Sequence, residues 1–243
     1  MSVRIAAVGD LHIGTDTAGR VARAFRGLGE RADMLLIAGD LTRVGSDVEV
    51  ACVIEELAVV DVPIVAVLGN HDHHDGDPEG VSDHLTAAGI TVLEGESTII
   101  GTSACTVGVA GVKGFGGGFP GCSASEFGEL EMKRFVRHTA ESAQRLERCL
   151  QELQSDFRVA LLHYSPIAET LQGEPVGIYP FLGSYLLAEA IDRGGADLAL
   201  HGHAHRGCDR GLTPGGVRVR NVAQPVLGAP YCVFELGGGS STT

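Results

Sequence analysis

The chain has 243 residues, of which 44% are hydrophobic and 20% charged, and this balance excludes a disordered or fibrous protein. Acidic side chains outnumber basic ones by 31 to 18, and the formal charge of -13 disfavours nucleic acid as a partner. No apolar run approaches the ~20 residues that span a bilayer, and the first residues reach an aspartate too soon for a signal peptide. We therefore expect a cytoplasmic protein with no membrane partner.

The first third of the chain alternates between short apolar runs and amphipathic segments. Residues 3–10, 33–40 and 62–70 are apolar and each ends on a glycine followed by a polar residue, which is typical of buried parallel strands. Between them, residues 17–31 and 46–60 carry apolar side chains at helical spacing. The pattern predicts a β-α-β-α-β unit, which binds ligands outside the carboxyl ends of its strands.

The middle of the chain changes character near residue 90. Residues 91–95, 97–102 and 106–112 resemble shorter strands of an antiparallel or mixed sheet. The glycine-rich residues 111–121 lack the order of a phosphate-binding loop, so we expect a flexible loop near the site. A Ser-x-x-Glu cap and continuous helical spacing then predict one long helix over residues 125–154.

The last third predicts four more strands and a helix, and no repeat or linker interrupts it. We therefore expect one domain over residues 1–236, followed by a flexible tail at 237–243. The predicted strands are residues 157–166, 196–205, 217–225 and 229–236, and the predicted helix is 181–194.

Six cysteines are scattered along the chain without a C-x-x-C pair that would indicate a zinc ribbon or a redox motif. We expect reduced and mostly buried thiols. They are Cys52, Cys105, Cys122, Cys149, Cys208 and Cys232.

Imidazoles, carboxylates and an amide follow the ends of five predicted strands. A divalent metal centre uses such deprotonated oxygen and neutral imidazole ligands, whereas hydrogen bonding alone does not require them. Seven candidate ligands exceed the needs of one ion, but two ions sharing one carboxylate would use all seven. In chain order the strand-end residues are Asp10, His12, Asp40, Asn70, His71, Asp72, His163, His203 and His205.

These motifs, D-x-H, G-D, G-N-H-[DE], H and G-H-x-H in this order, resemble those of the calcineurin-like metallophosphoesterase superfamily. They span residues 10–205, and five motifs in order are far more specific than any one of them. The resemblance implies an α/β fold, a four-layer α-β-β-α sandwich of two mixed sheets flanked by helices.

The resemblance also implies a role for each side chain. Two divalent ions, of manganese, iron or zinc, would lower the pKa of a bridging water, and the resulting hydroxide would attack phosphorus in line. A catalytic imidazole would bind the phosphate and protonate the leaving group, which is typically worth ~10²–10⁴-fold in rate. One ion would be held by Asp10, His12 and His205, the other by Asn70, His163 and His203, with Asp40 bridging and His71 catalytic.

One position departs from the family pattern. In the phosphatase branch a second aspartate, three positions after the bridging one, pairs with the catalytic histidine, whereas this chain has Arg43 there. The orienting partner of His71 is therefore open, and the adjacent Asp72 is one candidate.

Four further residues are candidate substrate contacts, each with a plainer alternative. Phe115 and Phe119 would stack on a substrate ring or else anchor their loop, and Arg206 and Tyr164 would reach the phosphate or else have no role in binding. His201 lies inside an apolar strand and is expected to be a hydrogen-bonded core residue rather than an eighth ligand.

The sequence thus predicts a metal-dependent phosphoesterase acting on a phosphodiester or phosphomonoester of a small substrate, such as a nucleotide or cyclic nucleotide. A nuclease of the same superfamily is one alternative, although this short acidic chain lacks an added DNA-binding surface. A non-catalytic metal-binding scaffold is another, but scaffolds usually lose a ligand or the histidine. The oligomeric state stays open.

Overall fold

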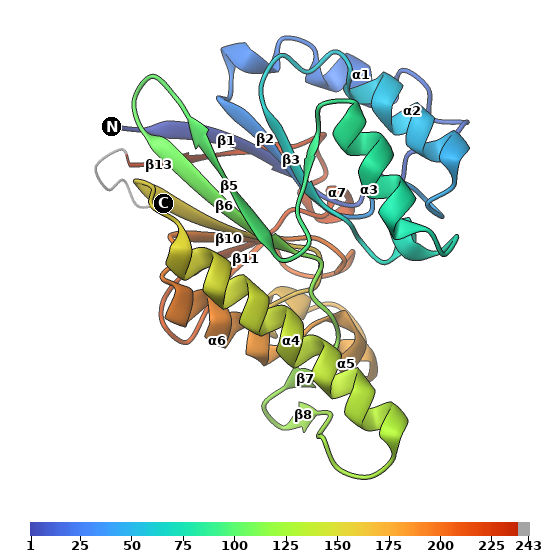
Figure 1. Cartoon of the computed structure of the whole chain (residues 1–243), viewed down its shortest axis with the longest axis vertical. Coiled ribbons are helices and arrows are strands. Elements are labelled where there is room, and N and C mark those ends of the chain that lie inside the picture. Colours follow the sequence, from blue (N-terminus) through green and yellow to red (C-terminus); the bar gives the residue numbers. More distant parts are fainter. Residues whose placement is uncertain (238–243) are drawn as a thin grey trace.

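The computed structural model describes residues 1–237, in which two β-sheets pack face to face and helices cover both outer faces (Figure 1). This arrangement confirms the predicted four-layer α-β-β-α sandwich. Of the predicted tail, residues 238–243 lie outside the described residues.

The first sheet has the order β13-β1-β2-β3-β4. Its strands β1 (Val3–Val8), β2 (Met34–Ala38), β3 (Ile64–Val67) and β4 (Thr91–Val92) run parallel, as the three apolar runs predicted for the first three. The last strand, β13 (Cys232–Leu236), returns antiparallel beside β1. The carboxyl ends of β1, β2 and β3 therefore lie at one edge.

Helices α1 (Arg20–Phe25), α2 (Asp47–Leu57) and α3 (Pro78–Ala87) cover the outer face of this sheet. Side chains of β1 alternate between the two faces, as the pleat requires. Ala6 packs towards the helices and Ile5 towards the second sheet. The helix predicted over residues 17–31 is divided into α1 and a 3₁₀ turn.

The second sheet has the order β11-β12-β10-β9-β6-β5, with four parallel central strands and an antiparallel strand at each edge. Its ligand-bearing strands again end at one edge. The strands are β5 (Glu96–Gly101), β6 (Thr106–Val112), β9 (Phe157–Leu162), β10 (Leu198–His201), β11 (Arg210–Leu212) and β12 (Arg218–Asn221).

Helices α4 (Leu130–Glu152) and α6 (Tyr185–Gly194) cover the other outer face, where Leu146 packs with Leu187. The predicted start of the long helix at residue 125 was wrong. Gly128 has a φ of 96°, a left-handed conformation that a helix cannot continue through, so α4 begins at Leu130.

The glycine-rich residues 111–121 form a packed segment, which corrects the expectation of a flexible loop. Strands β7 (Gly118–Phe119) and β8 (Cys122–Ser123) make a small hairpin against α5 (Tyr179–Leu182). The N–H of Gly117 donates to the carbonyl of Pro180 at 2.7 Å, so backbone hydrogen bonds hold the segment in place.

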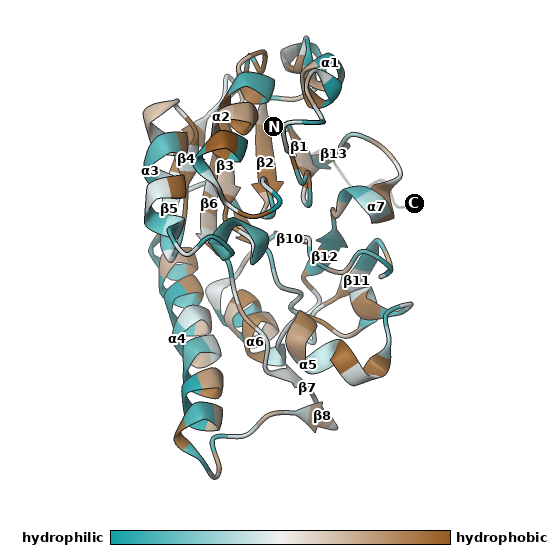
Figure 2. Ribbon diagram, turned by 90° about the vertical axis from the view of Figure 1, so that its right-hand side faces the viewer, coloured by the Kyte–Doolittle hydropathy of each residue, from teal (hydrophilic) through white to brown (hydrophobic). Residues whose placement is uncertain are grey.

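Brown, hydrophobic ribbon is concentrated in the strands and on parts of the helices, as Figure 2 shows. None of the helices within residues 1–237 is both long and apolar enough to cross a membrane.

The six cysteines are all free. Cys105 alone is buried, Cys122 is exposed and the other four are partly exposed, so the expectation of mostly buried thiols was wrong.

Short elements complete the described chain. They are the 3₁₀ turns η1 (Leu28–Glu30), η2 (His71–His73), η3 (Glu169–Leu171) and η4 (Val176–Ile178), and the short helix α7 (Gln224–Leu227).

Candidate metal centre

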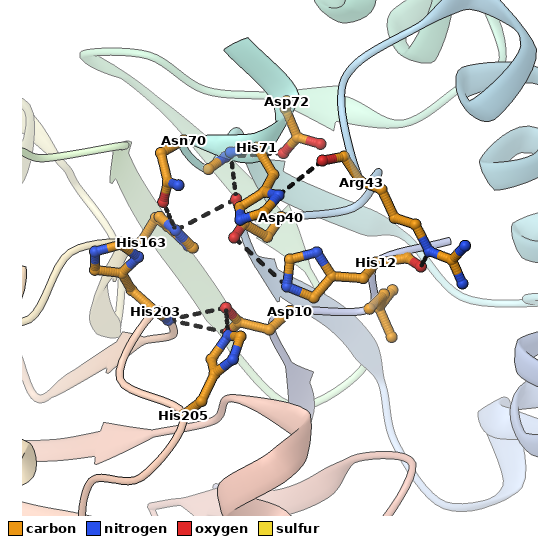
Figure 3. A network of polar contacts seen from close by, with 12 residues as sticks. Asp10, His12, Asp40, Arg43, Asn70, His71, Asp72, His163, His203 and His205 are labelled. Atoms are coloured by element: carbon orange, nitrogen blue, oxygen red, sulfur yellow. Dashed lines mark hydrogen bonds and ion pairs between the residues drawn. The ribbon is translucent and has the colours of Figure 1, made fainter. Parts of the chain in front are cut away.

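The seven candidate ligands and His71 converge between the two sheets (Figure 3). They follow the carboxyl ends of β1, β2 and β3 in the first sheet and of β9 and β10 in the second. Because parallel strands of one sheet end at the same edge, residues far apart in sequence meet there.

A first group of potential ligand atoms lies on Asp10, His12 and His205, all within 4.8 Å of one another. Nε2 of His205 is 2.8 Å from Oδ1 of Asp10, and Nε2 of His12 is 3.7 Å from Oδ2 of Asp40. Asp40 is only 1% exposed and stands between this group and the next.

A second group consists of Asp40, His163 and His203, with Asn70 beside it. Nε2 of His163 is 2.9 Å from Oδ1 of Asn70 and 3.4 Å from Oδ1 of Asp40. Asp40 also forms a group with His12 and His71, so it adjoins His12 of the first group and stands where a bridging ligand would.

The Nε2 atoms of two histidines lack a hydrogen-bond donor within residues 1–237, and such an environment suits a cation. Nδ1 of His163 lies 2.8 Å from the carbonyl of Ala38 and must donate to it, so the Nε2 of a neutral ring carries a lone pair. That lone pair faces two acceptor oxygens, of Asn70 and Asp40. Nε2 of His12 is buried and has no hydrogen-bond partner within residues 1–237. Metal ions bound at the two groups would satisfy these atoms.

The backbone is strained at the same place. In the part of the chain that the structure describes, four non-glycine residues have a positive φ, and all four are candidate ligands: Asp10 (58°), His12 (44°), Asp40 (51°) and His203 (69°). Each such conformation costs about 1–3 kcal/mol and persists only where surrounding structure enforces it, typically at functional sites.

A glycine makes room for the bridging carboxylate. A Cβ at Gly69 would overlap the Oδ1 of Asp40, so no larger residue fits before Asn70. The glycine of the G-N-H motif is therefore required by the close approach of the backbone to Asp40.

His71 is oriented by a main-chain carbonyl. Its Nδ1 donates to the carbonyl oxygen of Arg43 at 2.7 Å, which leaves Nε2 free, and its ring centroid is 4.6 Å from that of His12. The Arg43 guanidinium forms an ion pair with Asp16 and donates a hydrogen bond to the His12 carbonyl at 3.1 Å. These contacts link the turn after β2 to the turn after β1. The backbone carbonyl of Arg43 thus accepts the hydrogen bond that an aspartate at this position accepts in the phosphatase branch.

Asp72 does not orient His71, contrary to the candidate role considered above. Its carboxylate is 1% exposed and accepts hydrogen bonds from the N–H groups of Leu41, Thr42 and Gly69 and from the Thr42 hydroxyl. These bonds tie the turn after β2 to the turn after β3, so Asp72 positions the backbone of both.

Burial keeps two of the imidazoles neutral. It lowers the pKa of His203 to about 3 and also lowers the pKa of His12, so both rings are unprotonated near pH 7, as metal ligation requires. The hydrogen bond to Asp10 instead raises the pKa of His205, so a proton competes with a metal at that ring.

The candidate substrate contacts have different surroundings. The Tyr164 ring lies 4.4 Å from that of His203, and Phe115 packs 5.7 Å from Tyr164. Phe119 is 4% exposed and belongs to a small buried cluster, so it anchors its segment. Arg206 is exposed, and its backbone N–H donates to Glu174 at 2.7 Å.

His201 is fully buried and bonded to the Thr170 hydroxyl at 2.8 Å, which confirms the expectation of a hydrogen-bonded core residue. One residue beside the site was missed from the sequence. Lys113 directly follows the end of β6, just as the candidate ligands follow the ends of their strands. This position in the sequence could have marked it as a candidate site residue.

Comparison with known proteins agrees with this site. The family model for calcineurin-like phosphoesterases matches residues 3–207, and the chain therefore belongs to the calcineurin-like phosphoesterase family. It is accordingly a phosphate-ester hydrolase of a family that uses divalent metals. A search of curated protein sequences found no significant match.

Solved structures share the fold at low identity. A phosphopantetheinyl hydrolase from Mycobacterium tuberculosis is 15% identical with a TM-score of 0.68, covering 90% of this chain and 88% of that one. A putative 5′-nucleotidase from Staphylococcus aureus is 17% identical (TM-score 0.56; 91% and 48% covered), and a Mycoplasma pneumoniae phosphatase is 13% identical (TM-score 0.52; 92% and 72% covered).

Proposed function

We propose that this protein hydrolyses a phosphodiester or phosphomonoester of a small substrate with two divalent ions that share Asp40. The observation that carries the proposal is that the buried Asp40 carboxylate groups with His163 and His203 on one side and with His12 on the other. Asp10, His12 and His205 hold the first ion, and Asn70, His163 and His203 hold the second.

When bound, the ions supply an activated water and a positive field for the phosphoryl oxygens. The protein fixes their ligands in advance, because the Ala38 carbonyl orients the His163 ring and the backbone N–H of His203 donates to the Asp10 carboxylate at 3.0 Å. Neutral Asn70 limits the negative charge of the ligand set.

His71 acts on the leaving group. Its Nδ1–H is held by the Arg43 carbonyl, so Nε2 faces the site, and in the doubly protonated ring the Nε2–H is the group that binds the phosphate and delivers a proton to the leaving oxygen. His71 also lies within 4.8 Å of ligand atoms of His12 and Asp40, so its role as an acid rather than a ligand requires a test by metal content.

A small substrate is favoured over nucleic acid by the formal charge of -13. The names of two proteins of this fold, a phosphopantetheinyl hydrolase and a putative 5′-nucleotidase, also point to small phosphate esters. The mixed oxygen and imidazole ligands suit manganese, iron or zinc.

The test is turnover of a generic aryl phosphodiester and aryl phosphomonoester by protein stripped of metal and reloaded with manganese, iron or zinc. We expect metal-dependent turnover, two ions per chain, and a loss of at least ~100-fold in Asp40→Asn. Asp75→Asn is the matched control, because Asp75 is an exposed aspartate five residues after Asn70.

Unchanged turnover in Asp40→Asn, or fewer than two ions at saturation, would refute the shared centre. Metal-loaded protein without turnover of either ester would favour the scaffold alternative. A panel of cyclic nucleotides, nucleotide sugars and single-stranded DNA then separates small-substrate hydrolysis from nuclease action.

A further inference from the structure

Lys113 lies at the carboxyl end of a strand beside those that carry the candidate ligands. It directly follows β6, which pairs in parallel with β9, the strand that leads to His163. The Lys113 carbonyl accepts hydrogen bonds from the N–H groups of His163 and Tyr164, both at 3.0 Å. The lysine is thus fixed beside a proposed metal ligand.

The Lys113 ammonium is available to a ligand. Within residues 1–237 its Nζ makes no hydrogen bond or ion pair, and it is not among the fully buried polar atoms although the residue is half-buried. The nearby Glu94 carboxylate accepts the backbone N–H of Lys113 at 3.0 Å and lies 3.7 Å from Arg145. Nζ is 5.5 Å from the Phe115 ring centroid, and the charges of Glu94 and Asp40 act on it.

Tyr164, whose backbone N–H donates to the Lys113 carbonyl, carries a second such group. The residue is 7% exposed, and its hydroxyl makes no hydrogen bond to any described residue and is not among the fully buried polar atoms. Its ring lies between those of His203 (4.4 Å) and Phe115 (5.7 Å). Two residues with available donors therefore adjoin the second ligand group: Tyr164, whose ring contacts His203, and Lys113, whose carbonyl bonds the His163 backbone.

Metal loading changes the electrostatics around this lysine. Without ions, burial lowers the pKa of Lys113, and the negative charges of Glu94 and Asp40 oppose this effect. Two divalent cations would outweigh the carboxylates of Asp10 and Asp40, so the loaded site would add positive charge near this half-buried cation. Such a pair of neighbouring positive centres favours an anion that contacts both.

We propose that Lys113 and Tyr164 form an anion subsite that holds a second phosphoryl group of the substrate, so that diphosphates such as nucleoside diphosphates are preferred over compounds with one phosphoryl group. An ammonium is a strong point-charge partner for phosphate, and a phenol adds a neutral donor. The inference rests on the proposed metal centre, because the first phosphoryl group binds there.

The test is calorimetric binding of methylphosphonate and methylenediphosphonate to manganese-loaded protein, with metal content measured for every variant. The native protein should bind the diphosphonate at least about tenfold more tightly, the usual worth of a charge-assisted hydrogen bond. Lys113→Met should bring the ratio of the two affinities close to one, Lys113→Arg should restore part of it, and Tyr164→Phe should lower it. Lys133→Met, at the other lysine of the chain, is the matched control and should keep the native ratio.

A native ratio near one, or a Lys113→Met variant that keeps the native ratio, overturns the subsite. Equal weakening of both probes by Lys113→Met also overturns it, because a general field effect would then explain the loss. If methylphosphonate does not need manganese to bind, the proposed metal centre itself fails, and this outcome is distinct from the loss of preference alone.

Discussion

At the scale of single residues, the orientation of His71 depends on the main chain. The Arg43 carbonyl takes the Nδ1 proton, so the identity of the residue at position 43 matters less than the path of its backbone. An acidic side chain is not required there, because any carbonyl oxygen with this geometry accepts the same hydrogen bond.

Replacing His71 by alanine should lower kcat by ~10²–10⁴-fold, because the proposed general acid is removed. The variant should keep both metal ions. Elemental analysis measures the metal content, and steady-state kinetics measures kcat. Replacing His74, an exposed histidine of the same turn, by alanine is the control and should leave both quantities unchanged. Loss of an ion from His71→Ala would instead make His71 a ligand.

Gly69→Ala should disrupt the site without removing a ligand. The added Cβ overlaps the Asp40 carboxylate, so we expect metal affinity to fall by about tenfold or more while the fold is kept. Gly101→Ala adds the same methyl group at an open position on β5 and should bind metal normally. Metal titration by calorimetry compares the two, and equal affinities would contradict the steric account.

Side chains at strand ends could be predicted from the sequence, because an apolar run that stops at a glycine and a polar residue marks both the strand and its end. Asp10, Asp40 and Asn70 follow this rule and meet as expected. The role of the Arg43 carbonyl could not be predicted, because every residue has a carbonyl. The four hydrogen bonds of Asp72 depend on two turns that come together only in the fold.

At the scale of elements, helix and strand types followed from periodicity, but several boundaries did not. The cap predicted at residue 125 is cancelled by Gly128, which leaves α4 to begin at Leu130. The glycine-rich residues 111–121 lack apolar periodicity, so their packing against α5 had no signature in the sequence.

The turns after β2 and β3 are joined by Asp72, and Asp72→Ala should therefore destabilise the fold. Removing the carboxylate leaves four buried donors with no partner, which we expect to cost about 3 kcal/mol or more. Urea unfolding of chelated protein measures the loss without contributions from metal. Asp75→Ala, at the nearby exposed aspartate, should unfold like the native protein, and equal stabilities of the two variants would refute the role of Asp72.

At the scale of the whole molecule, the two sheets meet at their carboxyl edges around the proposed metal centre. Asp10 and Asp40 are 2% and 1% exposed, so without ions the sandwich buries two carboxylates between its layers. Chelation should lower Tm, since each site held at a hundredfold excess over its Kd contributes about 2.7 kcal/mol. Thermal unfolding with and without chelator measures the shift, and Asp40→Asn should reduce it. An unchanged Tm in the native protein would contradict a link between the sheets.

Anomalous diffraction from manganese-loaded crystals tests the shared centre most directly. We predict two peaks, about 3.5–4 Å apart, on either side of the Asp40 carboxylate, one near His12 and His205 and the other near His163 and His203. A single peak, or two peaks that do not share Asp40, would contradict the account.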